Sequence, residues 1–269
     1  MVKRDVPMTE KILIFDASSL ISFAMNGLLG YLEELKKIFP GKFIIPQEVK
    51  HEVIDRPLTI KRFELEAMQV NQLLLNKTIE LPSAIGVSDK EISEETKKLL
   101  DIANNAFTEK NKPVHLIDLG ETACVALAKI LNKNSIPNLL VIDERTTRML
   151  CEKPDNLRKL LTKKHHTTIK YDKNSLAEFT GFKIIRSAEL AFLAHKKGIV
   201  KIKDKKVLDA LIYALKFKGC SISTEEIEEL KRIDESKMYE IYDKWPEIAK
   251  ESYNTKINEV DFKNIDHIV

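Results

Sequence analysis

The sequence predicts an α/β fold, an α/β/α sandwich in which helices cover both faces of a mostly parallel β-sheet. The composition is that of a globular protein, since 43% of the 269 residues are hydrophobic and 32% are charged. Two short apolar runs, residues 12–16 and 139–143, each end in an aspartate. Their unbroken hydrophobicity is typical of strands buried on both faces. A strongly apolar stretch at residues 118–131 predicts a helix between them, and alternating strands and helices indicate a parallel sheet.

The first part of the chain adds a second strand and several helices to this frame. Ser18 and Ser19 suit the start of a helix directly after the strand at 12–16. Residues 43–45 predict a second strand, and Pro46 fits the first turn of a following helix. A helical insertion is then expected at residues 59–110, with helices at 63–75 and 92–107.

The part of the chain after residue 145 predicts a further strand and a helical end. Residues 155–181 are polar, and we expect an irregular insertion or mobile loop there. Ser223 and Glu226 have the spacing of a capping box at the start of an amphipathic helix. The other expected elements are helices at 145–151, 187–197 and 207–215 and a last strand at 182–185. We therefore divide the chain into a main domain, residues 1–200, and a C-terminal helical extension, residues 201–269.

Cysteine content, charge and hydropathy exclude several classes of protein. The three cysteines are far apart and lack a Cys-x-x-Cys spacing, so we expect buried thiols and neither a disulfide framework nor a zinc site. The net charge is only +3, so a nucleic-acid footprint would have to be local. No apolar run is long enough to span a membrane, and residues 1–10 lack the apolar segment of a secretory signal. We expect a cytoplasmic protein with no membrane partner.

Four carboxylates carry the predicted chemistry. Two of them end predicted strands, and the carboxyl ends of strands in open α/β sheets are where ligands bind. Like charges brought together there must be compensated by protons or by a cation. Oxygen ligands without nearby His or Cys favour Mg²⁺ or Mn²⁺ over zinc, and such ions suit phosphodiester hydrolysis. The four predicted ligands and catalytic residues are Asp16, Glu52, Glu121 and Asp143.

Four segments containing these acids also occur in a recognisable order. They are Phe-Asp16-Ala-Ser18-Ser-Leu-Ile, Ile-Pro-Gln-Glu-Val-Lys-His-Glu52-Val, Gly120-Glu121-Thr-Ala-Cys-Val-Ala-Leu-Ala and Leu-Val-Ile-Asp143-Glu144-Arg145. In these segments the chain resembles the PIN-domain nuclease superfamily, in particular its prokaryotic branch with a Gly-Glu helix. The resemblance covers about residues 12–199. The helical insertion and the C-terminal extension are not part of that family's minimal fold.

The resemblance implies a metal-dependent ribonuclease that uses Mg²⁺ or Mn²⁺. It implies that the same four acids form the site, with Ser18 as the small polar residue after the first acid and Glu144 as an auxiliary residue. It also implies RNA as the substrate and a possible homodimer. A toxin of this family would have an antitoxin as protein partner, whereas the added helices fit a processing role. RNA and DNA both stay open as substrates.

Each site residue also has a structural interpretation. Asp16 and Ser18 could cap the following helix, and Glu121 could form a capping box with Asp118. Glu52 could be a solvated residue, or Glu48 could take its place one turn earlier. Glu144 could be a surface charge. The basic residues Lys163 and Lys164 could contact a phosphate backbone or belong to a solvated loop.

Two other functions compete with the nuclease hypothesis. The first is a catalytically silent PIN-like module that binds RNA or a protein through its added helices; four intact acids weigh against it. The second is a phosphohydrolase of the haloacid dehalogenase type, which also begins with an apolar strand ending in aspartate. That chemistry expects a second aspartate two residues later, where this chain has Ser18.

Overall fold

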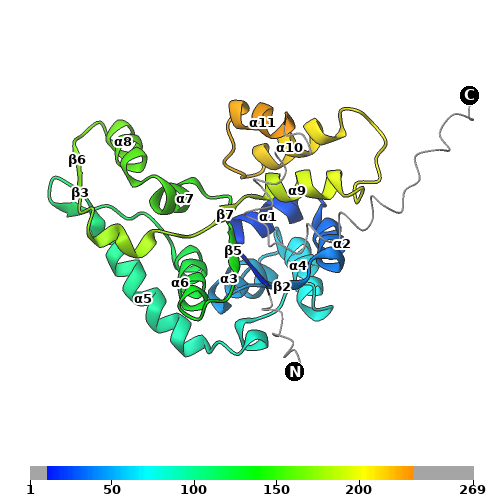
Figure 1. Cartoon of the computed structure of the whole chain (residues 1–269), viewed down its shortest axis with the longest axis horizontal. Helices are drawn as coiled ribbons and strands as arrows, with labels where there is room; N and C mark the ends of the chain where they lie inside the picture. The colour runs from blue at the N-terminus through cyan, green and yellow to red at the C-terminus, as the bar shows by residue number, and fades with distance from the viewer. Residues whose placement is uncertain (1–10, 233–269) are drawn as a thin grey trace, which may run out of the picture. The chain divides into compact units, whose positions relative to one another are not determined.

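A four-stranded parallel sheet stands at the centre of the computed structural model, which describes residues 11–232 (Figure 1). Its strands are β1 (Lys11–Phe15), β2 (Gly41–Ile44), β5 (Asn138–Val141) and β7 (Ile184–Ile185), in the spatial order β2-β1-β5-β7. Every neighbouring pair is parallel. β1 is buried along its whole length, as its unbroken apolar sequence predicts. The expected α/β fold with a parallel sheet is confirmed.

The strand order reverses at β1. β2 follows β1 along the chain and pairs with one side of it, whereas the later strand β5 pairs with the other side. The ladder continues to the first aspartate, because Asp16 N donates to Val141 O at 3.0 Å. Ligands of open α/β sheets bind at the carboxyl ends of strands at such a reversal. Asp16 and Asp143 follow the two strands that flank it.

Helices connect β1 to β2 and then form the predicted insertion. α1 (Ala17–Met25) and α2 (Leu29–Ile38) precede β2, and α3 (Gln47–Lys50) follows it and continues as the π-helical turn η1 (His51–Asp55). The insertion helices are confirmed as α4 (Glu64–Leu75) and α5 (Asp89–Ala106), with the short 3₁₀ helices η2 (Pro57–Thr59) and η3 (Pro82–Ile85) beside α4. The predicted second helix ends one residue early, because Phe107 begins a strand.

Helix α6 (Leu119–Lys133) packs directly on the sheet. It contacts β1 and β5, and its buried face carries the small residues Ala123, Cys124, Ala126 and Ala128. Small side chains let the helix approach the strands closely, so its first turn is held near the carboxyl end of β1. In Figure 1, α6 lies on one side of β5, and α1 and α9 (Ser187–Lys196) lie on the other.

The prediction of an irregular loop at residues 155–181 is wrong. After α7 (Arg145–Glu152), this stretch forms α8 (Pro154–His165), β6 (Ile169–Tyr171) and the 3₁₀ helix η4 (Ser175–Phe179). β6 pairs antiparallel with β3 (Phe107–Glu109), which pairs with β4 (Lys112–Pro113) in a second sheet. A few apolar residues in a polar stretch carry this structure: Leu157, Leu161, Ile169, Leu176 and Phe179 are all buried.

The described part of the chain ends in two more helices, α10 (Val207–Phe217) and α11 (Thr224–Lys231), and the compact unit extends to Lys231. The predicted capping box is confirmed: Glu226 N donates to Ser223 Oγ at 3.1 Å, and Ser223 N donates to Glu226 Oε2 at 2.7 Å. The three cysteines are buried, as expected. No helix within residues 11–232 is both long and apolar enough to cross a membrane. Two predictions lie outside the described residues: the lack of a secretory signal at residues 1–10 and the part of the helical extension at residues 233–269.

The close approach of β1 and β2 gives a test of the fold. Gly41→Ala is expected to lower the free energy of unfolding by about 2 kcal/mol, because its Cβ would lie 2.0 Å from Lys11 O on the neighbouring strand. Gly30→Ala on α2 is the matched control, since a Cβ there meets nothing within 4 Å; it should gain about 0.5 kcal/mol. Urea denaturation of both variants measures the difference, and equal midpoints would contradict this packing.

Candidate functional site

Asp16 is a buried carboxylate, and its two oxygens differ in their contacts. It is 1% exposed and caps α1, where its Oδ2 accepts hydrogen bonds from Ser18 N at 3.1 Å and Ser18 Oγ at 2.5 Å. The helix-cap interpretation of Asp16 is therefore correct, but it accounts for one oxygen only. Among the described residues, the buried Oδ1 has no hydrogen-bond partner. Burial is the main cause that raises the pKa of Asp16 to about 6; the hydrogen bonds from Ser18 act against this rise, and the charge of Glu52 adds to it.

Ser18 joins the ends of the two central strands. Its hydroxyl donates to Asp16 Oδ2 and accepts a hydrogen bond from Asp143 N at 3.1 Å. The alternative interpretation, a hydroxyl that caps the helix, does not describe this geometry, because Asp16 is the capping residue. Ser18 thus orients the first acid and fixes it beside the end of β5.

Glu121 lies in the first turn of α6 and faces the same region. Its Oε2 accepts a hydrogen bond from Asp118 N at 3.0 Å, so the predicted capping contact is present. Burial raises the pKa of Glu121 to about 8, and the charges of Asp16 and Glu144 contribute to this rise. Glu144 in turn caps α7 through a hydrogen bond from Thr147 N to its Oε2 at 2.7 Å. This hydrogen bond holds the Glu144 side chain at the start of α7.

Glu52 approaches this region from the π-helical turn η1. Partial burial raises its pKa, followed by the charge of Asp118, while Arg56 acts in the opposite direction. A Cβ on Gly120 would lie 2.6 Å from Glu52 Oε2, so the glycine leaves the space that this carboxylate occupies. Glu48 lines the same cavity of about 610 Å³ as Glu52. The Coulombic influence on Asp16, however, comes from Glu52.

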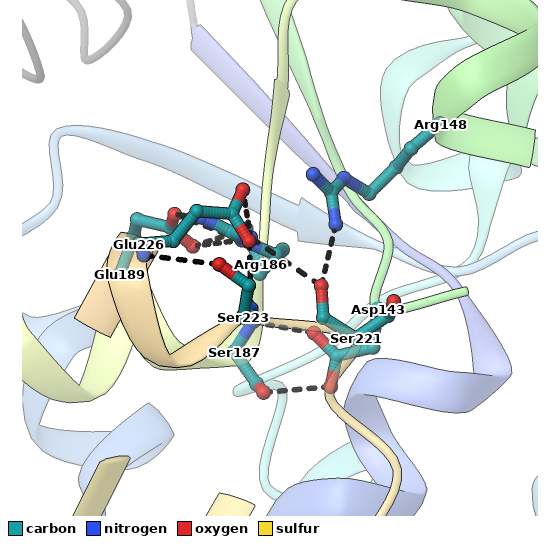
Figure 2. A network of polar contacts seen from close by, with 8 residues as sticks. All are labelled: Asp143, Arg148, Arg186, Ser187, Glu189, Ser221, Ser223 and Glu226. Carbon is teal, nitrogen blue, oxygen red and sulfur yellow. Dashed lines mark hydrogen bonds and ion pairs between the residues drawn. The ribbon is translucent and has the colours of Figure 1, made fainter. Parts of the chain in front are cut away.

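Asp143 is fully buried, but its carboxylate has other partners. Its Oδ1 accepts from Ser187 N at 2.7 Å and its Oδ2 accepts from Ser187 Oγ at 2.6 Å (Figure 2). Ser187 is the first residue of α9. The carboxylate is therefore placed at a helix N-terminus, where a negative charge is stabilised. In this arrangement Asp143 anchors α9 to the end of β5.

A polar network extends from Asp143 to the C-terminal helices (Figure 2). Ser221 N donates to Asp143 O at 3.1 Å, and Ser221 O accepts from Arg148 Nη1 at 2.9 Å. The buried guanidinium of Arg186 bonds Ser221 O at 3.3 Å and Glu226 Oε1 at 2.9 Å. The segment before α11 is thereby tied to the end of β5. Sequence reasoning assigned no role to these arginines, since their partners come from distant segments.

The structure thus brings together three of the four predicted acids. We define the acid cluster as Asp16, Glu52, Glu121 and Glu144: the charge of Glu52 acts on Asp16, and those of Asp16 and Glu144 act on Glu121. Asp143 is linked to it through Ser18, with its carboxylate directed to Ser187. Within residues 11–232, no three His, Cys, Asp or Glu side chains are arranged to hold a metal ion as they stand.

The two predicted phosphate-contacting residues, Lys163 and Lys164, are exposed on α8. Gly120 and Ser187 were not predicted as site residues from the sequence. The only local patterns that could have indicated them are the Gly-Glu pair at 120–121 and the Ile-Arg-Ser run at 185–187.

Comparisons with protein-family models, with curated proteins and with solved structures found no significant match to this chain.

The raised pKa of Glu121 makes protein stability depend on pH. The folded state keeps a proton that the unfolded chain, with a pKa of 4.5, releases, so stability falls as pH rises from there to about 8. Glu121→Gln keeps the acceptor for Asp118 N and removes the charge. Its gain in unfolding free energy should grow from near zero at about pH 4 to about 2 kcal/mol at about pH 9. Urea denaturation in chelator measures this gain.

The matched control is Glu229→Gln, which removes an exposed glutamate of α11. It should change stability by less than about 0.5 kcal/mol at either pH. An equal effect of Glu121→Gln at low and high pH would contradict the raised pKa.

Proposed function

We propose that this protein is a PIN-like, metal-dependent endoribonuclease with an α/β/α sandwich, which hydrolyses RNA phosphodiester bonds with Mg²⁺ or Mn²⁺. The observation that carries the proposal is the buried Oδ1 of Asp16, which has no hydrogen-bond partner within residues 11–232 and lies at the reversal of strand order. A buried carboxylate oxygen is costly without a partner. The neighbouring carboxylates Glu52 and Glu121 increase that cost through their like charges.

The donor set of the acid cluster fits a hard divalent cation. Asp16, Glu52 and Glu121 offer only oxygen atoms, which Mg²⁺ and Mn²⁺ prefer. The nearest thiol, Cys124 one turn after Glu121, is buried, and burial raises its pKa well above its usual value. It stays a protonated, weak ligand. When bound, the cation would activate water and neutralise charge at the scissile phosphate.

The surrounding residues would hold and orient these ligands. Ser18 fixes Asp16 Oδ2 and leaves Oδ1 free. The Asp118 amide fixes one oxygen of Glu121, and Gly120 leaves room for Glu52. Asp143, the fourth predicted ligand, holds α9 through Ser187 and keeps the end of β5 beside Asp16. Glu144 would add negative potential from the start of α7.

Cleavage of labelled RNA tests the proposal. The wild-type protein should cleave RNA with Mn²⁺ and lose this activity in chelator. Asp16→Asn should lower cleavage by at least about a hundredfold while the protein stays folded, because asparagine also caps helices well. Glu229→Gln is the control variant. A DNA panel run in parallel identifies the substrate class, and unchanged cleavage by Asp16→Asn would defeat the assignment.

A second variant tests Glu52 without removing any carboxylate. The Cβ of Gly120→Ala should push the Glu52 carboxylate away and weaken Mn²⁺ binding about tenfold. The fold should be kept or gain about 0.5 kcal/mol, since alanine is favoured in helices. Gly30→Ala is the control for alanine in a first helical turn. Calorimetric Mn²⁺ titration with thermal denaturation reads both effects, and an unchanged Mn²⁺ affinity would remove Glu52 from the site.

One observation favours the catalytically silent RNA- or protein-binding module as a second candidate. Both carboxylate oxygens of Asp143 already have partners on Ser187, and the acids of residues 11–232 are not gathered into a coordination sphere. The Mn²⁺ titration separates the two functions, because a silent module has no need to bind the ion. An antitoxin or other protein partner, a homodimer and a cytoplasmic location are compatible with either function, and they stay predictions.

A further inference from the structure

A cleft separates the β3–β4 hairpin from α8, on the second sheet. Its cavity has a volume of about 650 Å³. Three lysines line it: Lys110 and Lys112 on the hairpin, and Lys164 on α8. All three are exposed, and none has an ion-pair partner within residues 11–232. The floor is formed by Val114, Leu116 and Leu161, which are buried.

The one acid among the lining residues already has hydrogen-bond partners. Glu109 Oε1 accepts a hydrogen bond from Thr167 Oγ1 at 2.9 Å, and its Oε2 lies 2.8 Å from His165 Nδ1. These two contacts hold the pKa of Glu109 below its usual value. The carboxylate is thus held by partners on the α8 side, and its single negative charge is outnumbered by the three lysine charges, so the lining keeps a net positive charge.

The hairpin holds one lysine in an unfavourable backbone conformation. Lys110 has φ +48° and Asn111 has φ +65°, as the two central residues of a type I′ turn require. Asparagine and glycine are preferred at such positions, and a lysine there is uncommon. Because the turn is short, it presents the Lys110 charge from a well-defined position at the edge of the cleft.

The cleft adjoins the acid cluster at two points. Thr146, which lines it, lies two residues after Glu144 at the start of α7. His115, which also lines it, has its Nε2 2.8 Å from Asp118 Oδ1, and the Asp118 amide bonds Glu121. A chain lying along the lysines would therefore continue toward the carboxylates.

We propose that this cleft binds the phosphate backbone of single-stranded RNA and leads it to the acid cluster; this rests on the proposed function and names where the substrate lies. A cleft with a net positive charge attracts phosphates. The lining residues include no Phe, Tyr or Trp ring for base stacking, so we expect binding to depend on salt and only weakly on sequence. The earlier prediction of a phosphate contact at Lys164 enters this proposal. Lys163 does not line the cleft.

The test measures RNA binding apart from cleavage. Fluorescence anisotropy with a labelled single-stranded RNA is run on the Asp16→Asn protein in chelator, with and without the triple change Lys110→Asn, Lys112→Gln and Lys164→Gln. We expect affinity to fall at least about tenfold and the salt slope to fall by about 2, or about 0.7 for each phosphate contact. The Lys110→Asn change suits its turn, so folding should be retained.

A second triple variant removes the same charge elsewhere. It combines Lys77→Asn, Lys133→Gln and Lys183→Gln; Lys77 also has a positive φ, +61°, and all three side chains are exposed. Lys133 ends α6 at the end opposite to Glu121, and Lys183 precedes β7. This control should keep its affinity within about twofold. Equal losses in the two triple variants, or none in the cleft variant, would overturn the proposal.

Two outcomes separate this inference from the proposed nuclease function. If the wild type cleaves RNA and the cleft variant cleaves it with unchanged KM, the cleft assignment fails and the nuclease assignment holds. If RNA binds through the cleft lysines but wild-type protein with Mn²⁺ does not cleave it, the nuclease assignment fails and the binding site holds.

Discussion

The mutual repulsion of carboxylates at the end of β1 is the constraint on which the site depends. Asp16 is buried, and one of its oxygens has no hydrogen-bond partner in the part of the chain that the structure describes. The charge of Glu52 acts on Asp16, and the charge of Asp16 acts on Glu121. A fold under selection for stability alone would replace such a group by a neutral one. Electrostatic strain of this kind is common where a protein binds a ligand.

The two aspartates at the ends of the central strands have different hydrogen-bond partners and therefore different roles. One oxygen of Asp16 accepts hydrogen bonds from Ser18, and the other has no partner among the described residues. Both oxygens of Asp143 accept hydrogen bonds from Ser187. Ser18 connects the two through the Asp143 amide. Asp16 therefore offers an oxygen to a ligand, whereas Asp143 connects the end of β5 to α9 and, through Ser221, to the segment before α11.

Local signals predicted most of the fold. The strand ending at Asp16, the cap at Ser223 and the helix at Glu121 each depend on a few neighbouring residues, so the sequence determined them well. Distant pairings were not predictable in this way. Phe107 pairs with Tyr171 in the second sheet, and Asp143 turns to Ser187, 44 residues away. The polar composition of residues 155–181 hid an ordered α8 and β6, because a handful of buried apolar side chains was enough to fix them.

The π-helical turn η1 has a consequence for how this chain can vary over evolution. A π-helical turn contains one residue more than an α-helical one at the same place, and Glu52 is the second residue of η1 and lies next to Gly120 of α6. Loss of one residue before Glu52 would rotate its side chain by about 100° around the helix axis, away from α6. Homologous chains should therefore accept substitutions in this turn far more readily than a change in its length.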